Sequence, residues 1–244
     1  IGEIATANLN KFLHYLLHER DAPCSPKSYA RRVTTLKVFF KWLHEGGILA
    51  SDPAAPVIQH SVSTPLPEIL SDAEIEQALQ VTQDMWSAKK PDPRPHLLLN
   101  LLLDTAMKKS ECMSIHLDHI HRESPEGPFV QIRYDNPTKK TKERKLELSP
   151  DTLRVLDDYL EIYDPQETLF PCTARNLEYV LSDVAEQADI EEKGISFEML
   201  RWTASTRDYR AGMEGTRIRQ KLGISEVTWQ ETRKKLEKLA DQDE

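Results

Sequence analysis

The sequence predicts a mainly α-helical protein with a small antiparallel β insert. Apolar side chains recur every three or four positions along much of the 244 residues, which is the spacing of one helix face. Strand-like alternation occurs in only two short stretches, residues 129–134 and 145–148. A proline-containing stretch at residues 51–67 reads as a linker. We therefore expect one helical domain over residues 1–64 and a larger domain over residues 65–244.

Two helices are expected in residues 1–64. The apolar face of the first consists of Leu9, Phe12, Leu13, Leu16 and Leu17. The second has Ser25 as its N-cap and Pro26 in its first turn, and it ends at Gly46-Gly47. Its apolar stripe is formed by Tyr29, Val33, Leu36 and Phe40. Four basic residues fall largely off that stripe and fit either a solvated face or a binding surface, namely Lys27, Arg31, Lys37 and Lys41.

The larger domain is expected to be helical around a basic β-hairpin. Ser71, Ser149 and Ser196 each stand where a helix N-cap is expected, and residues 97–107 are apolar enough for a buried helix. The two strand-like stretches flank the turn sequence Asp135-Asn136-Pro137-Thr138. Between and within them lie five basic residues, Lys139, Lys140, Lys142, Arg144 and Lys145.

The charge is uneven along the chain. The formal net charge is −8, which by itself argues against a nucleic-acid binder because phosphate contacts need positive charge. Residues 1–64 carry seven basic and five acidic side chains, a net of +2, which leaves −10 for the rest. In that acidic remainder, basic residues concentrate in the hairpin and in residues 201–221. The net charge therefore limits the strength of attraction to nucleic acid without excluding binding.

Composition also indicates the compartment. No apolar run is long enough to span a membrane, and the first residues lack the basic and apolar pattern of a secretory signal. Three widely spaced cysteines, Cys24, Cys112 and Cys172, favour a reducing compartment over a disulfide scaffold. We expect an intracellular, cytoplasmic protein.

Several short motifs occur in a recognisable order. Residues 103–111 resemble a Thr-Gly-Leu-Arg-x-x-Glu box, and residues 139–144 resemble a Gly-Lys-Gly-x-Lys-x-Arg hairpin. Residues 196–203 resemble His-x-Leu-Arg-His-Thr, and residues 220–225 resemble Leu-Gly-His-Ser. With the Leu-Ser-Asp-Ala-Glu-Ile opening at residues 70–75, this order resembles the tyrosine recombinase (phage integrase, Xer-like) family over nearly the whole chain.

The resemblance implies a SAM-like core-binding domain followed by a tyrosine-recombinase-like catalytic-fold domain. In that family a tyrosine attacks a DNA phosphate, while arginine, lysine and histidine or tryptophan side chains neutralise charge and move protons. The chemistry needs no cofactor and no metal. It implies double-stranded DNA as the partner and a nucleoid-associated location, and it allows a homo-oligomer or a partner recombinase contacted through the C-terminal segment Glu226–Lys238.

The family's catalytic positions are only partly retained. Lys139 and Arg201 match, whereas Lys108 replaces an arginine and loses its bidentate fork. The three remaining positions hold residues that cannot perform the expected roles, Glu198, Ile224 and Arg233. No tyrosine follows Tyr209, which lies on the helix predicted for Arg201. Because covalent catalysis fails without its nucleophile, we expect a DNA-binding protein that does not cleave strands.

DNA contacts are expected from the basic residues on the surfaces that family members turn toward duplex DNA. These residues are Lys27, Arg31, Lys37, Lys41, Lys108, Lys139, Lys140, Lys142, Arg201, Arg207 and Arg210. Two alternatives remain open at this stage. One is a diverged but active recombinase, and the other is an interaction module that has lost DNA binding.

The sequence also contains candidate residues for a different class of site. Cys112, with His116, His119 and His121 nearby, could suggest a thiol hydrolase or a metal centre. Cys112 lies in an apolar helical run, which favours an inert structural cysteine, and no fourth ligand stands at zinc-binding spacing. We therefore expect no metal. Trp42, Trp202 and Trp229 are expected to be core residues rather than platforms for base stacking.

Overall fold

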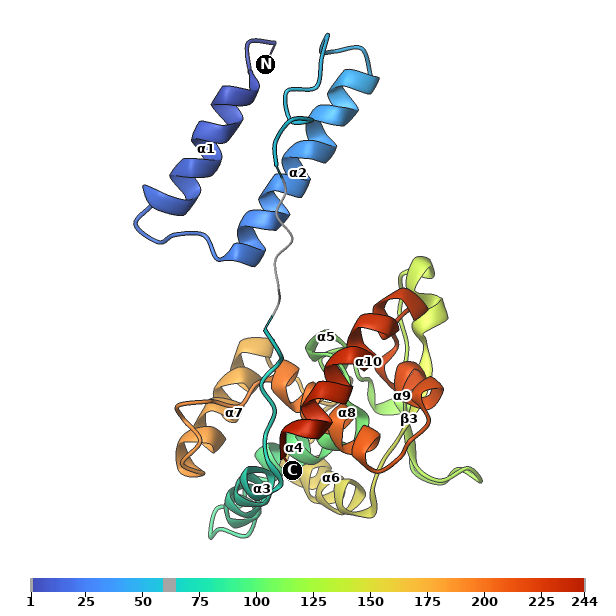
Figure 1. The fold of residues 1–244 in the computed structure, drawn as a ribbon. Helices are drawn as coiled ribbons and strands as arrows, with labels where there is room; N and C mark the ends of the chain where they lie inside the picture. Colours follow the sequence, from blue (N-terminus) through green and yellow to red (C-terminus); the bar gives the residue numbers. More distant parts are fainter. Residues whose placement is uncertain (1, 59–64, 244) are drawn as a thin grey trace. The chain divides into compact units, whose positions relative to one another are not determined.

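The structure is a computed structural model that describes residues 2–58 and 65–243 (Figure 1). It is mainly α-helical with one small antiparallel sheet, as the sequence predicts. The chain divides into two compact units, Ile1–Pro65 and Leu66–Glu244, and each is described by itself. The boundary predicted near residue 64 falls in 59–64, outside the described residues. In the described part of the chain, no helix is long and apolar enough to cross a membrane.

Unit 1 consists of α1 (Thr6–His18), α2 (Pro26–Glu45) and the loop that follows. Helix α2 begins as predicted, because Ser28 donates its N–H to Ser25 Oγ at 3.3 Å and Pro26 occupies the first turn. It ends as predicted at Gly46. A small core forms between the two helices and the loop, from Leu9, Leu13, Leu16, Val33, Phe40, Leu43, Leu49, Ala54 and Val57.

Two aromatic residues predicted to be in this core are exposed instead. Phe12 is 44% exposed and Trp42 is 62% exposed. Each directly precedes a buried leucine, Leu13 or Leu43, and one residue along an α-helix is a rotation of about 100°. The spacing of the apolar residues is therefore compatible with Phe12 and Trp42 in the buried stripe. The face of each helix that packs in the core nevertheless does not include them. By contrast, Trp229 is 6% exposed and is a core residue as predicted.

Unit 2 is built around one buried helix, α4 (Arg94–Thr105), which packs against α3 (Asp72–Trp86), α6 (Pro150–Tyr163), α7 (Ala174–Gln187) and α8 (Phe197–Arg210). Leu98 in α4 has no exposed surface. The predicted caps are confirmed, since Ser71, Ser149 and Ser196 each accept an N–H from the third residue after them. The remaining helical segments are α5 (Lys109–Cys112), α9 (Gly215–Leu222), α10 (Glu226–Ala240) and the 3-10 helices η1 (Leu117–His119), η2 (Pro137–Lys142) and η3 (Asp241–Asp243).

The predicted hairpin is present as β2 (Phe129–Ile132) and β3 (Arg144–Glu147), paired antiparallel with Ile132 opposite Arg144. A third strand, β1 (Ile120–His121), pairs with β2. It is too short to give a periodic signal in the sequence. The connection between β2 and β3 is η2 rather than a simple turn, and it begins where Asn136 Oδ1 accepts the N–H of Thr138. Tyr134, which the alternation placed in the strand, lies in this connection.

A second cluster in unit 2 joins α8, α9 and α10, with α10 lying across α8 (Figure 1). Its centre is Trp229, which packs closely on Gly215 at the start of α9. A Cβ atom at Gly215 would lie 2.9 Å from the Trp229 ring, so only glycine fits without a shift. The last helix is thus docked on its own unit.

Candidate nucleic-acid interface

The site begins with a sharp turn at the end of α4. Ala106 has φ 48°, the left-handed conformation, and donates its N–H to Leu102 O at 2.9 Å to close the helix. Glycine is the usual residue there, and a side chain in this conformation costs on the order of 1 kcal/mol. The resemblance places a glycine at this position. The turn directs the chain into α5, which carries Lys108 as its N-cap and Glu111 in its first turn.

Glu111 is the centre of the site. It is 3% exposed, and both of its carboxylate oxygens accept hydrogen bonds from Arg144, at 3.1 and 2.9 Å. The Tyr134 hydroxyl and the Lys108 N–H also donate to it. Burial alone would raise the pKa of Glu111, but the hydrogen bonds and charge of Arg144 outweigh burial and lower the pKa to about 2. The carboxylate is therefore ionised and fully hydrogen-bonded.

Arg144 extends this contact to the hairpin and to α9. Its Nε donates to Lys221 O at 2.7 Å and its Nη1 donates to Lys142 O at 3.0 Å. Gly223, with φ 59°, lies against the guanidinium, and a Cβ atom there would be 2.7 Å from Arg144 Nη1. Glycine is thus required at this position both for its backbone conformation and for space. One side chain joins α5, the base of the hairpin and the end of α9.

Arg201, predicted as a catalytic and DNA-binding residue, makes a second connection of the same kind. It is 9% exposed and donates to Ala106 O, at the end of α4, and to Leu222 O, at the end of α9. The carbonyls at a helix end lack partners in the helix, so these hydrogen bonds satisfy groups that would otherwise be buried unpaired. In this structure the guanidinium is engaged by protein.

Lys139, Arg201 and Lys108, which carry positive charge at family positions, lie around Glu111. Burial lowers the pKa of the half-buried Lys108; Glu111 raises it, and the charges of Arg201, Arg144 and Lys142 lower it further. Lys139 Nζ lies 5.8 Å from the centre of the Tyr134 ring, which itself contacts Glu111. The cluster combines one buried carboxylate with several cations, an arrangement that can attract a phosphate group.

The three positions that the resemblance predicts to be replaced lie in different surroundings. Glu198 is exposed and accepts a hydrogen bond from Trp202 Nε1 at 3.0 Å. Ile224 is half-buried and lines a cleft of about 1070 Å³ with Lys142 and Arg144. Arg233 is exposed and pairs with Glu237 on its own helix at 2.8 Å. Among the described residues, no hydrogen bond or ion pair connects Arg233 to the cluster around Glu111.

Neither Tyr209 nor Tyr134 has the surroundings of an activated nucleophile. Tyr209 lies on α8 with Arg201, as predicted, and packs against the α8–α10 cluster. Tyr134 contacts the site directly, but burial and its hydrogen bond to Glu111 raise its pKa to about 12. A phenol that is held protonated in this way is a weak nucleophile.

The eleven residues predicted to contact DNA differ in exposure. Lys37 and Lys108 are half-buried and Arg201 is buried, whereas eight are exposed: Lys27, Arg31, Lys41, Lys139, Lys140, Lys142, Arg207 and Arg210. Three also hold partners within the chain: Lys37 donates to Ala55 O, Lys41 pairs with Glu45 at 3.6 Å, and Arg210 donates to Leu239 O. The three hairpin lysines form the densest exposed group, because all of them lie on η2.

Three residues of the central network have no site role predicted from the sequence. Glu111 and Arg144 belong to two motifs and lie 33 positions apart, Arg144 is predicted only as a basic residue of the hairpin, and the alternation predicts Tyr134 in a strand. The sequence signal for Glu111 is its place just after the apolar run that ends at Met107. A carboxylate buried there needs a cationic partner.

The cysteine and histidine candidates do not form a reactive centre. Cys112 is fully buried, and burial raises the pKa of its thiol, which makes it unreactive. His116, His119 and His121 lie on η1 and β1 and at their edge. Among residues 2–58 and 65–243, no group of three or more His, Cys, Asp or Glu side chains is arranged to hold a metal ion.

Comparison with known proteins identifies the family. The model of the phage integrase family matches residues 68–230, which is more than half of the chain. The protein therefore belongs to this family, the tyrosine recombinases, and the resemblance in its motifs is confirmed.

Individual relatives are distant. The chain is 27% identical to tyrosine recombinase XerD of Agrobacterium fabrum over 163 residues, covering 65% of this chain and 46% of that protein. It is 24% identical to XerC of Caldanaerobacter subterraneus over 241 residues, covering 93% of this chain and 64% of that protein. The chain thus spans less than two thirds of either relative.

Solved structures show the same fold. The XerH site-specific recombinase bound to a palindromic difH substrate superposes with a TM-score of 0.77 at 15% identity, covering 99% of this chain and 70% of that one. A lambda integrase dimer bound to a core site gives a TM-score of 0.68 at 14% identity, covering 96% and 81%.

The Glu111–Arg144 pair predicts a measurable loss of stability. Replacing Glu111 with Gln leaves the buried Arg144 without its counter-charge, and we expect unfolding to become easier by about 3–5 kcal/mol in urea denaturation. The matched control is Glu178→Gln, which removes an exposed pair with Lys109 at 2.6 Å and should cost less than about 1 kcal/mol.

The pH dependence has a defined sign. Folding lowers the pKa of Glu111 from its ordinary 4.5 to about 2, so its ionised form stabilises the fold above about pH 4.5. That contribution is lost as the pH falls toward 2. Glu111→Gln should therefore lose less stability than the unchanged chain between pH 4.5 and 2, and equal losses would contradict this role for Glu111.

Proposed function

We propose that this protein binds double-stranded DNA and does not cleave it. The observation that supports the proposal is Arg233, which the motif resemblance assigns to the family's nucleophile position and which is exposed and paired with Glu237. Strand cleavage in this family forms a bond between tyrosine and a DNA phosphate, and an arginine cannot form that intermediate. We also propose that the protein is cytoplasmic and associated with the nucleoid.

The other replacements act in the same direction. Glu198 adds a carboxylate at a position where a donor would contact a phosphate, and it would repel that group. Ile224 offers no hydrogen bond at the next donor position. Lys108 keeps a positive charge but cannot make the two parallel hydrogen bonds of an arginine fork. Charge that develops in a transition state would therefore be poorly stabilised.

DNA binding is supported by charge and by the relatives. Lys139, Lys140 and Lys142 are exposed together on η2, where they could contact phosphates. XerH and lambda integrase, which share the fold, were solved with DNA. Contact through α10 with a second copy or a partner recombinase would use only its exposed side, because Trp229, Leu236 and Leu239 are buried in its own unit.

The proposal is tested directly by an assay for DNA cleavage. The substrate is a duplex chosen from a random-sequence library by its binding to the chain. A nick in this duplex traps any covalent intermediate. We expect a complex on native gels and no protein–DNA adduct that survives denaturation. A denaturation-resistant adduct would establish the alternative, an active and diverged recombinase.

The role of the hairpin is tested by salt dependence. Replacing Lys139, Lys140 and Lys142 together with Gln should weaken DNA binding and reduce the slope of log affinity against log salt by about 3, because each lost phosphate contact removes about 0.9. Fluorescence anisotropy over a range of salt concentrations measures both quantities.

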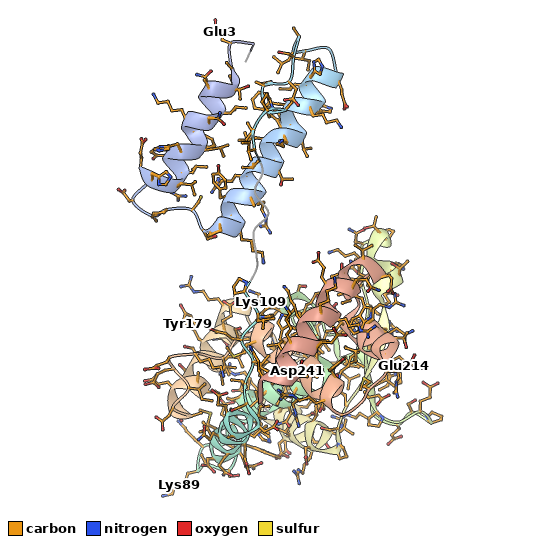
Figure 2. The ribbon with its side chains drawn as sticks, viewed as in Figure 1. Glu3, Lys89, Lys109, Tyr179, Glu214 and Asp241 are labelled. Carbon is orange, nitrogen blue, oxygen red and sulfur yellow. The ribbon has the colours of Figure 1, made fainter. Side chains whose placement is uncertain are left out.

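The matched control is the pair Lys89→Gln and Lys90→Gln. These exposed lysines follow α3, at the opposite end of unit 2 from the hairpin (Figure 2). Their replacement should leave the slope unchanged. A near-zero salt slope for the unchanged chain would instead support an interaction module that has lost DNA binding.

A further inference from the structure

The connection that carries the hairpin lysines has no core of its own. Every residue from Asp135 to Lys142 is exposed, and η2 contributes no buried side chain. The hydrogen bonds at its start are local, because Asn136 accepts the N–H groups of Thr138 at 3.0 Å and of Lys139 at 2.9 Å. Such bonds fix the shape of η2 and not its position on unit 2. A segment without buried contacts keeps its position only through the contacts at its ends.

Tyr134, at the start of this connection, is held to the rest of unit 2 by three kinds of contact. Its N–H donates to Glu143 Oε1 at 3.0 Å, which closes the connection across nine positions. Its half-buried ring packs against the core of unit 2. Its hydroxyl donates to Glu111, the buried carboxylate that also binds Arg144. One residue therefore joins the start of the connection to the centre of the site.

The ring of Tyr134 also faces one of the hairpin lysines. Lys139 Nζ lies 5.8 Å from the centre of the ring, within the range of about 6 Å over which a cation is attracted to an aromatic face. The hydroxyl end of the side chain is thus fixed on the buried carboxylate, while the ring attracts a residue of η2. We propose that Tyr134 is a positioning residue that holds the η2 lysines in place for contact with DNA phosphates. This proposal rests on the DNA-binding function proposed above.

Positioning and charge have different effects on DNA binding. A mobile segment must be ordered when it binds, and this ordering lowers the affinity, whereas a segment held in place beforehand avoids that loss. Tyr134 is uncharged at neutral pH, since burial and its hydrogen bond to Glu111 raise its pKa to about 12. Its loss should therefore lower the affinity without removing a phosphate contact. Loss of a lysine changes both the affinity and the salt slope.

Arg144 holds the opposite end of the connection and does so without Tyr134. Its Nη1 donates to Lys142 O at 3.0 Å, and its Nη2 donates to Glu111 Oε2 at 2.9 Å. Removal of the Tyr134 hydroxyl therefore leaves Glu111 with its cationic partner and leaves β2 paired with β3. We expect Tyr134→Phe to remain folded, which circular dichroism and urea denaturation verify, and its effect to be confined to η2.

Binding measurements on two variants of Tyr134 test the proposal. Tyr134→Phe keeps the ring and removes only the hydroxyl, and we expect it to weaken binding to the duplex chosen from the random-sequence library about fivefold, because ordering η2 then opposes binding. Fluorescence anisotropy should show this loss at every salt concentration, with the same salt slope as the unchanged chain. Tyr134→Leu also removes the ring that attracts Lys139, and it should weaken binding by a further factor of about two.

Tyr163, at the end of α6, provides a matched control. It too is half-buried against the core of unit 2, its hydroxyl donates to Asp92 Oδ1 at 2.8 Å, and the guanidinium of Arg94 lies 5.4 Å from the centre of its ring. Tyr163→Phe therefore removes the same kind of hydrogen bond away from the hairpin. It should lower stability in urea by a similar amount and leave DNA affinity unchanged. An equal loss of affinity in both variants would overturn the proposal, because general destabilisation would then be the cause.

The order of η2 in the absence of DNA is a second and independent readout. We expect ¹⁵N relaxation to give order parameters of about 0.8 for the amides of Lys139, Lys140 and Lys142 in the unchanged chain, and of about 0.6 or less in Tyr134→Phe. Equal order in the two chains, or an unchanged affinity of Tyr134→Phe for the duplex, would overturn the proposal. A chain that binds no duplex at any salt concentration would contradict the proposed function, and the relaxation data would still decide whether Tyr134 holds η2.

Discussion

The ion pair between Arg144 and Glu111 is the contact on which the arrangement of the site depends. It joins the short helix α5, the base of the hairpin and the C-terminal end of α9 through one buried guanidinium. Pairing and complete hydrogen bonding make burial of both charges tolerable, whereas either charge alone would be expensive. Gly223 leaves the space that the guanidinium occupies. Together with the pairing of β2 and β3, this interaction holds the base of the hairpin whose η2 carries the lysines.

Arg201 makes the second connection, between the ends of α4 and α9. Both arginines therefore have structural roles that are independent of chemistry on DNA. These structural roles favour both arginines whether or not the chain cleaves DNA, because removing either one would leave buried carbonyls or a buried carboxylate without partners. The side chains of Arg233 and Glu198 have only exposed contacts, with Glu237 and Trp202, and such contacts contribute little to stability.

Much of the fold could be predicted from local sequence signals, because these report on single helices and turns. Ser25, Ser71, Ser149 and Ser196 marked helix starts correctly, and the hairpin was identified from its alternation and its turn residues. Periodicity could not determine which side of α2 would pack, so Trp42 was misplaced. Strand β1, with two residues, is created by pairing with β2 and has no pattern of its own.

Individual residues of the site could be predicted from the sequence, but the contacts between them could not. Motif order identified Lys108, Lys139 and Arg201, and the structure gathers them around Glu111. The contacts of Arg144 with residues 33 and 77 positions away depend on tertiary folding and leave no local signal. The same holds for Tyr134, whose hydroxyl reaches Glu111 only because the strand ends at Ile132.

Our proposal is that the recombinase framework of this chain is intact and that a few side chains prevent strand cleavage. Its most direct test is a chain carrying Lys108→Arg, Glu198→His, Ile224→His and Arg233→Tyr together, incubated with a nicked duplex that it binds. We expect a covalent protein–DNA adduct with this variant and none with the unchanged chain. An adduct with the unchanged chain would contradict the claim, as would a folded, DNA-binding variant that forms none.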